Sequence, residues 1–240
     1  MKRLVALAAL AAGCSYAHVA ARAPEVPVFS RYDAPAKVAP RTRRLFVLVP
    51  GILGWGWEWD EALAMLRAAP DVTVEAFEWA PSASLARSAA DFARRLDELL
   101  ATLPPGVTRV VVVAHSAAGL IAAHAAAKLH LPPGRTVEFA VVGAPYAGLH
   151  ASPVAYTPDN LDTPFAIALG GTFARYPAPV PGVRFESWVT DGARDPVMAS
   201  RFGHDPGDPQ VGPPGPRHRL PTTADHNRVL AQVVRELLAR

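Results

Sequence analysis

Residues 109–119 read RVVVVAHSAAG, a sequence in which four consecutive valines lead directly into an alanine, a histidine and a serine. Valine is branched at Cβ and favours strands, and a continuous apolar run is typical of a strand that is buried on both faces. The alanine-rich sequence that follows favours a closely packed helix. The segment therefore predicts a buried parallel strand that ends at Ser116 and a helix that begins directly after it.

Strand-like and helix-like stretches alternate along the chain from residue 44 onward. Apolar or β-rich runs predict strands at residues 45–49, 72–79, 110–114, 137–142 and 184–190. Helical periodicity predicts helices at residues 57–69, 85–103, 117–129 and 226–238. In the second helix the periodic residues are Leu85, Ala89, Phe92, Leu96, Leu99 and Leu103. This alternation indicates an α/β fold, with a mostly parallel, doubly wound sheet and helices on both faces.

Composition indicates one domain with a large core. Half of the residues are hydrophobic and 19% are charged, and no internal repeat is visible. Residues 41–240 are therefore interpreted as a single domain, with proline- and glycine-rich excursions at 144–182 and 196–221. The formal net charge is +3, with no basic block and no basic stripe between aromatic residues, so we expect no nucleic-acid partner.

The first residues have the layout of a secretory signal. Lys2 and Arg3 precede an apolar run at residues 4–12, which is too short to span a bilayer, and small residues follow it. The only cysteine, Cys14, comes after LAAG, and this segment resembles the bacterial lipoprotein signal, in which such a cysteine is lipidated and becomes the new N-terminus. The leucine stands four residues before the cysteine, whereas the commonest form has three.

The lipoprotein resemblance implies a definite organisation of the N-terminus. Residues 1–13 would be a signal peptide, and residues 14–40 would be a lipidated N-terminus and a tether to the domain. The protein would be exported and attached to the membrane through Cys14, as an outer-membrane lipoprotein that faces the periplasm or the cell surface. The alternative is cleavage after Ala17 or Ala21, which would give a periplasmic or secreted protein.

Ser116 lies where a predicted strand meets a helix, which is where sites occur in parallel sheets. The sequence AHSAAG at residues 114–119 resembles the nucleophile elbow of the α/β-hydrolase superfamily, and the bacterial lipases and esterases in particular. The resemblance implies the α/β-hydrolase fold and Ser116 as a catalytic nucleophile. Alanine stands at both flanking positions, where the usual form has glycine. The other interpretation is a serine that caps the following helix.

The resemblance also implies a base and an acid that follow the serine in the sequence. His226, in DHNRVL, is similar to the histidine segment of bacterial lipases, and the alternative is a surface histidine at a helix start. For the acid, Asp195 fits the family pattern best and Asp191 is the alternative; both follow the strand predicted at 184–190. His204 and His218 also stand after the serine and stay open as bases.

The resemblance implies that two backbone N–H groups stabilise the oxyanion. One is that of Ala117, the residue after the nucleophile. The other is that of Ile52, because VPGILG at residues 49–54 resembles the loop that supplies the second donor in lipases. The sequence GAPYAG at 143–148 is similar to a further lipase segment, and residues 149–182 occupy the place of a lid or acyl-binding cap. Three tryptophans, Trp55, Trp57 and Trp59, suit either an apolar acyl site or core packing.

These features together imply a carboxylic ester hydrolase, an esterase or lipase, with an acyl-enzyme on Ser116 and a Ser-Asp-His triad. It would need no cofactor or metal and would act on a small-molecule or lipid ester. The alternatives are an acyltransferase or thioesterase with the same triad, and a non-catalytic surface binding protein on a hydrolase scaffold. A metal site from His204, Asp205, Asp208 and His218 matches no established ligand spacing. The sequence does not indicate an oligomeric state.

Overall fold

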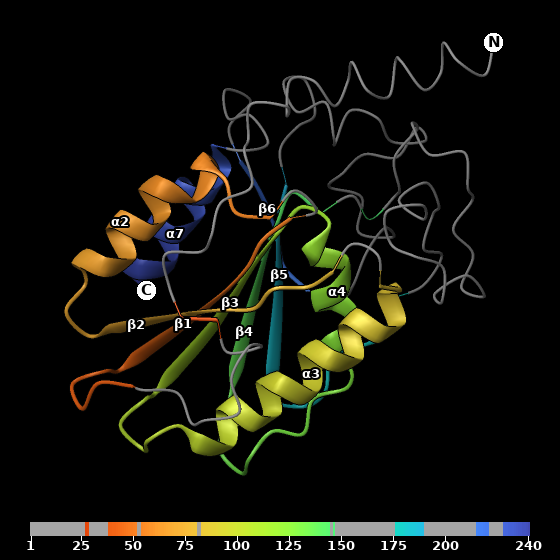
Figure 1. The fold of residues 1–240 in the computed structure, drawn as a ribbon, viewed down its shortest axis with the longest axis horizontal. Helices are drawn as coiled ribbons and strands as arrows, with labels where there is room; N and C mark the ends of the chain where they lie inside the picture. Colours follow the sequence, from red (N-terminus) through yellow and green to blue (C-terminus); the bar gives the residue numbers. More distant parts are fainter. Residues whose placement is uncertain are drawn as a thin grey trace.

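A parallel sheet forms the centre of the molecule (Figure 1). The computed structural model describes residues 27–28, 38–51, 54–80, 83–144, 146, 176–189, 215–220 and 228–240. Within these ranges the strands are β1 (Arg44–Val49), β2 (Val72–Ala76), β3 (Arg109–His115), β4 (Val137–Val142), β5 (Val183–Val189) and β6 (Arg217–Arg219). Their order in the sheet is β2-β1-β3-β4-β5-β6, and every neighbouring pair is parallel, which confirms the predicted sheet.

Helices cover both faces of the sheet. Helices α2 (Asp60–Ala68) and α7 (Val229–Ala239) lie on one face, and α3 (Leu85–Thr102) and α4 (Ala118–Ala125) lie on the other (Figure 1). Alternate side chains of each strand point to opposite faces, so Leu45 and Val47 join the core under α3 and α4, whereas Phe46 joins the core under α2 and α7. All six periodic residues predicted for the second helix are buried.

The strand order places the carboxyl ends of β1 and β3 side by side. The connection from β1 to β2 runs through α2 on one face, and the connection from β2 to β3 runs through α3 on the other. The chain therefore leaves β1 in one direction and returns to its opposite side. In open parallel sheets the crevice at such a switch point, beyond the carboxyl ends of the strands, is the usual place for a ligand.

Helix α7 is attached to the opposite, amino edge of the sheet. Arg109, the first residue of β3, donates from Nη1 to the carbonyl oxygen of Leu237 (2.6 Å), and Arg44, the first residue of β1, donates to that of Leu238 (2.9 Å). The last carbonyls of a helix have no partner within the helix, so these two arginines satisfy them. Helix α7 thus runs antiparallel to the strands and begins near their carboxyl ends.

Several boundaries differ from the predictions. Strand β2 ends at Ala76 instead of residue 79, and α4 ends at Ala125, four residues before the predicted end. Helix α7 begins at Val229 instead of residue 226, because Arg228 is still in a turn. Strand β6 lies in a stretch predicted to be a loop. Its sequence has no strand pattern of its own, and hydrogen bonding to β5 makes it a strand.

A short part of the predicted N-terminal tether contacts the folded core. The N–H of Ala76, the last residue of β2, donates to the carbonyl oxygen of Pro27 (2.8 Å), and Val28 forms a parallel bridge with Ala76. The Val28 side chain is buried under the α2 face. Residues 1–13 and Cys14 lie outside the described residues. Within the described ranges, no helix is long and apolar enough to cross a membrane.

Candidate active site

Ser116 has an unusual backbone conformation. Its φ angle is 55°, and among the described residues it is the one non-glycine residue with a positive φ. Its N–H donates to the carbonyl oxygen of Val142 at the end of β4 (2.8 Å), which fixes the turn between β3 and α4. A left-handed conformation costs an L-residue about 1–2 kcal/mol, so it persists only where the surroundings impose it. A strained strand-to-helix turn of this kind exposes a serine hydroxyl above a parallel sheet.

The two alanines after Ser116 lead into α4. Ala117 occupies the N-cap position, and the first N–H groups of a helix have no acceptor within the helix. Both Ala117 and Ala118 are buried. The helix comes closest to the end of β4 at Gly119, one residue after Ala118, where an added Cβ atom would lie 2.5 Å from Cβ of Ala144. Gly119 therefore provides the small residue that the helix needs against β4.

The glycine turn after β1 lies directly against Ser116. A Cβ atom built on Gly51 would lie 3.2 Å from Cβ of Ser116 and 3.5 Å from the carbonyl oxygen of His115. The N–H of Gly54 donates to the carbonyl oxygen of Gly51 (3.0 Å), which closes the turn. The predicted donor loop and the predicted nucleophile are therefore neighbours in space. Ile52, the predicted second donor, lies outside the described residues.

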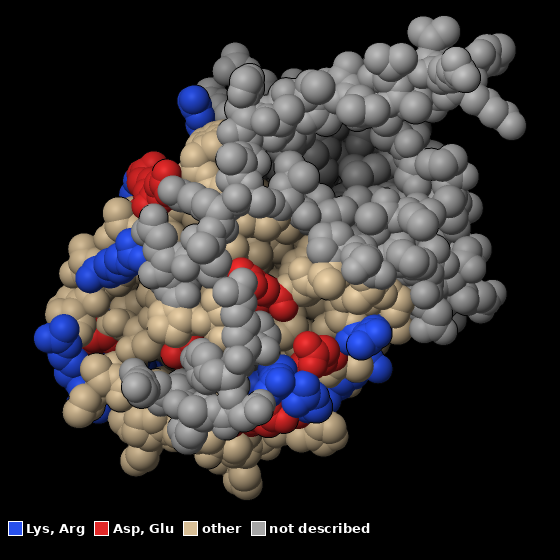
Figure 2. Space-filling model, in the orientation of Figure 1, with Lys and Arg blue, Asp and Glu red and all other residues tan. Residues whose placement is uncertain are grey.

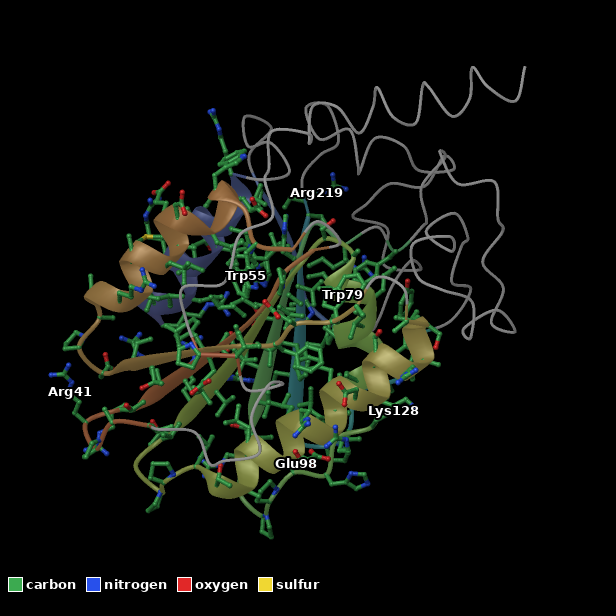
Figure 3. All side chains as sticks on the ribbon, viewed as in Figure 1. Arg41, Trp55, Trp79, Glu98, Lys128 and Arg219 are labelled. Carbon is green, nitrogen blue, oxygen red and sulfur yellow. The ribbon has the colours of Figure 1, made fainter. Side chains whose placement is uncertain are left out.

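The tryptophans that follow this turn have different environments. Trp55 and Trp59 are buried with ring centroids 5.3 Å apart, and Trp59 meets the ring of His115 edge-on at 6.2 Å. Trp57 has 43% of its surface exposed, and among the described residues no other large hydrophobic side chain is exposed. Figure 3 labels Trp55 and Trp79 near the carboxyl ends of the strands, where Nε1 of Trp79 donates to the carbonyl oxygen of Pro50 (2.8 Å). Core packing therefore accounts for Trp55 and Trp59.

The chain resembles known proteins in structure and not in sequence. No family model matches the sequence, and no curated protein matches it. The type II thioesterase YbtT from the yersiniabactin NRPS/PKS biosynthetic pathway has 14% sequence identity and a TM-score of 0.51, over 85% of this chain and 94% of that one. Esterase B from Lactobacillus Rhamnosis has 14% identity and a TM-score of 0.51, over 99% of this chain and 91% of that one.

The chain has the α/β-hydrolase fold. A third structure, Est1E from Butyrivibrio proteoclasticus, agrees, with 12% identity and a TM-score of 0.50 over 85% of this chain and 90% of that one. At these identities the similarity shows the fold alone. Within an α/β-hydrolase fold, Ser116 stands at the strand-to-helix turn where the family carries its nucleophile.

The predicted acid and base fall outside the part of the chain that the structure describes. Asp191 and Asp195 follow β5, whose last residue is Val189, and His226 precedes the N-cap residue Arg228 of α7. Both β5 and α7 meet the carboxyl edge of the sheet at these ends, which is the edge that holds Ser116. The predicted lid or cap, residues 149–182, is described only from residue 176.

His218, which the sequence left open as a base, has other partners. It lies on β6, and β4 and β5 separate it from β3, so at about 4.8 Å per strand it is roughly 14 Å from the strand of Ser116. Its Nε2 is 3.0 Å from Oε2 of Glu186, and its ring stacks on Trp188 at 4.2 Å. Among the described residues no group of histidine, cysteine and acidic side chains could hold a metal ion. His204, Asp205 and Asp208 lie outside them.

The buried Tyr146 and the partly buried Tyr176 pack against each other near the end of β4. The hydroxyl of Tyr146 lies 3.3 Å from Oγ of Ser187, and the hydroxyl of Tyr176 donates to the carbonyl oxygen of Tyr146 (3.3 Å). Burial raises the pKa of Tyr146 far above its ordinary value, so this side chain stays neutral. His124 of α4 lies against Tyr176, with ring centroids 5.6 Å apart.

On the described surface seen in Figure 2, cationic and anionic side chains are interspersed.

Proposed function

We propose that the chain is a serine hydrolase that cleaves carboxylic esters through an acyl-enzyme on Ser116. The observation that carries this proposal is the left-handed conformation of Ser116 at the end of β3. A serine that only capped α4 would need an ordinary extended backbone and would gain nothing from this strain. Support also comes from Gly51, which lies against Ser116 in the loop where the resemblance places an oxyanion donor.

The proposed reaction has two halves. Oγ of Ser116 attacks the ester carbonyl carbon while His226 takes the hydroxyl proton, and Asp195 orients the imidazole. The negative charge that develops on the carbonyl oxygen is stabilised by the N–H groups of Ala117 and Ile52. The C–O bond of the ester then breaks, His226 returns the proton to the leaving alcohol, and the acyl group stays on the serine. Water repeats the sequence, which releases the acid and restores the hydroxyl.

Thioester hydrolysis is the second candidate. The same attack on a thioester carbonyl expels a thiol instead of an alcohol, with the same residues in the same roles. It is favoured by the structural similarity to the type II thioesterase YbtT, which equals the similarity to esterase B, with a TM-score of 0.51 in each case. Transfer of the acyl group to an alcohol is the third outcome of the same intermediate.

A substrate panel with a serine variant tests the proposal. Purified protein would be assayed with p-nitrophenyl esters of increasing chain length and with acyl-CoA thioesters of the same acyl groups, with and without an added alcohol. We expect ester turnover that Ser116→Ala abolishes. The matched control is Ser88→Ala on α3, because Ser88 is a buried serine of the same scaffold with 4% of its surface exposed. Faster turnover of the thioesters would favour the thioesterase.

A fluorophosphonate probe separates the hydrolase from a non-catalytic binding protein. The probe reacts with activated serines, so wild type and Ser88→Ala should be labelled and Ser116→Ala should not. The acid of the triad is identified by comparing ester turnover by Asp195→Asn with ester turnover by Asp191→Asn. We expect loss of most of kcat in the first and near wild-type turnover in the second. An unlabelled wild type without turnover of any substrate would contradict the proposal.

We also propose, from residues 1–14 alone, that the protein is exported and lipidated on Cys14. Expression in a bacterial host with labelled palmitate would show lipid incorporation and membrane association that Cys14→Ser removes. Ester hydrolysis should not depend on this residue, so the two proposals are tested separately. A mature N-terminus after Ala17 or Ala21 would instead establish ordinary cleavage.

A further inference from the structure

His115, the last residue of β3, is buried beside the candidate nucleophile. Its side chain is 3% exposed and lies on the α2 and α7 face of the sheet, on the same side as Val111 and Val113. Trp59, which has no exposed surface, meets the imidazole ring edge-on with an angle of 88° between the ring planes. The histidine is therefore held between its own strand and the short helix η2 (Trp57–Trp59).

The same histidine lies beside Gly51, the first residue of the turn after β1. The side-chain atom of His115 nearest to a Cβ atom built on Gly51 is Nδ1, at 3.7 Å, and Cβ of Ser116 lies still closer, at 3.2 Å. Both His115 and Ser116 therefore border the space beside Gly51 that a side chain would otherwise occupy. The Gly51–Gly54 turn leads directly to Trp55, which packs on Trp59. Gly51 and Trp55 therefore both lie beside the His115–Trp59 pair.

We propose that His115, supported by Trp59, positions Gly51 against Ser116 and so sets the geometry in which the oxyanion is stabilised. The inference rests on the proposed function of Ser116. Donors in such a site must come within about 2.7–3.1 Å of the developing oxyanion. A displacement of about 1 Å can cost roughly 100-fold in rate. His115 and Trp59 are positioning residues, since neither takes part in bond making or breaking.

The position of His115 in the strand supports this role. Val111 and Val113 of β3 point to the same face and fill the core with apolar surface, whereas Arg109 at the start of the strand reaches the end of α7. Packing alone would be served by another aliphatic residue at the end of the strand. A flat ring that meets a tryptophan edge on one side and a glycine turn on the other defines a single arrangement of the three segments. The packing of this rigid ring beside Gly51 is the means by which the start of the turn is held.

The test compares His115→Ala and Trp59→Phe with Trp57→Phe as the matched control. Trp57 belongs to the same short helix but is 43% exposed, so its replacement leaves the contact with His115 unchanged. Steady-state kinetics with a p-nitrophenyl ester would be combined with inhibition by a trifluoromethyl ketone, which forms a tetrahedral oxyanion on the serine. Circular dichroism and thermal unfolding would establish that each variant is folded.

We expect kcat to fall about 10- to 100-fold in His115→Ala, with a smaller fall in Trp59→Phe, while KM changes less than about twofold. The affinity for the ketone should fall in proportion to kcat/KM, because both depend on the oxyanion geometry. A merely structural role would lower the unfolding temperature without this proportional loss. Trp57→Phe should keep wild-type values.

Two outcomes would overturn the inference while leaving the proposed function intact. One is a folded His115→Ala or Trp59→Phe protein with wild-type kcat and ketone affinity. The other is a loss expressed in KM alone, which would assign the pair to substrate binding. If His115→Ala does not fold, Trp59→Phe decides the question, because it keeps an aromatic ring in the core. An inactive wild type that the fluorophosphonate does not label contradicts the proposed function itself.

Discussion

Gly119 and Ala144 are in such close contact that a Cβ atom on Gly119 would lie 2.5 Å from Cβ of Ala144. The first turn of α4 could not stay this close to the end of β4 with any larger residue. We predict that Gly119→Ala destabilises the protein by about 1–3 kcal/mol, because the added methyl group overpacks a buried contact. Ala118→Gly, one residue earlier, should cost no more than about 1 kcal/mol. Urea unfolding of both variants measures the difference, and equal stabilities would contradict the packing argument.

A second prediction follows from the φ angle of 55° at Ser116. Both Ser116→Ala and Ser116→Gly remove the hydroxyl, but only glycine adopts a positive φ without strain. We expect the glycine variant to be more stable than the alanine variant by roughly 1 kcal/mol. For a domain of this size that corresponds to about 2–4 °C in Tm. Differential scanning calorimetry would check it, and a less stable glycine variant would show that the turn is not strained.

A third prediction concerns the two kinds of ion pair. Arg109 lies 2.9 Å from Oε2 of Glu138, which is 3% exposed, whereas Arg94 pairs with the exposed Glu98 within α3. Removing the partner of a buried charge costs about 3–5 kcal/mol in general, and an exposed helical pair contributes about 0.3–0.5 kcal/mol. Arg184 and Arg240 also approach Glu138, so we expect Arg109→Ala to cost about 2–4 kcal/mol. Arg94→Ala should be nearly neutral in the same unfolding assay.

A fourth prediction concerns the acid sensitivity of the fold. Burial, with a smaller effect from Lys128, lowers the pKa of His124 from 6.5 to about 4. Between these values the unfolded chain binds a proton that the folded protein does not bind, so stability falls as the pH falls. We expect His124→Gln to lose less stability than wild type between pH 7 and pH 4.5. The slope removed is at most about 1.4 kcal/mol per pH unit. Equal pH slopes in urea titrations would contradict the assignment.

The sequence predicted the centre of the sheet well because buried parallel strands are continuous apolar runs. Val110–Val113 could form little else, and the periodic leucines of α3 faced the core as expected. Strand β6 was missed because three polar residues, Arg217–Arg219, carry no periodicity, and only pairing with β5 makes them a strand. The C-terminal end of α4 and the N-terminal end of α7 are set by local turns, which helix propensities do not predict.

The candidate site was predictable only in part. Ser116 could be found because it directly follows a strand, and its strained turn agrees with that position. The contact between Gly51 and Ser116 depends on β1 and β3 being neighbours in the sheet, and strand order is not visible in a single sequence. The pairing of Trp59 with His115 likewise brings η2 beside the end of β3, which a single sequence does not reveal. The roles of Asp195 and His226 stay predictions.

The hydrogen bonds from Arg44 and Arg109 to the last carbonyls of α7 hold the C-terminal end of that helix in place. One residue inserted into it would shift the other end by about 1.5 Å and turn it by about 100°. Substitutions on its solvent side leave this length unchanged, whereas an insertion or deletion would alter the approach of the chain to the carboxyl edge of the sheet. The register of α7 should therefore tolerate far less variation than its surface composition.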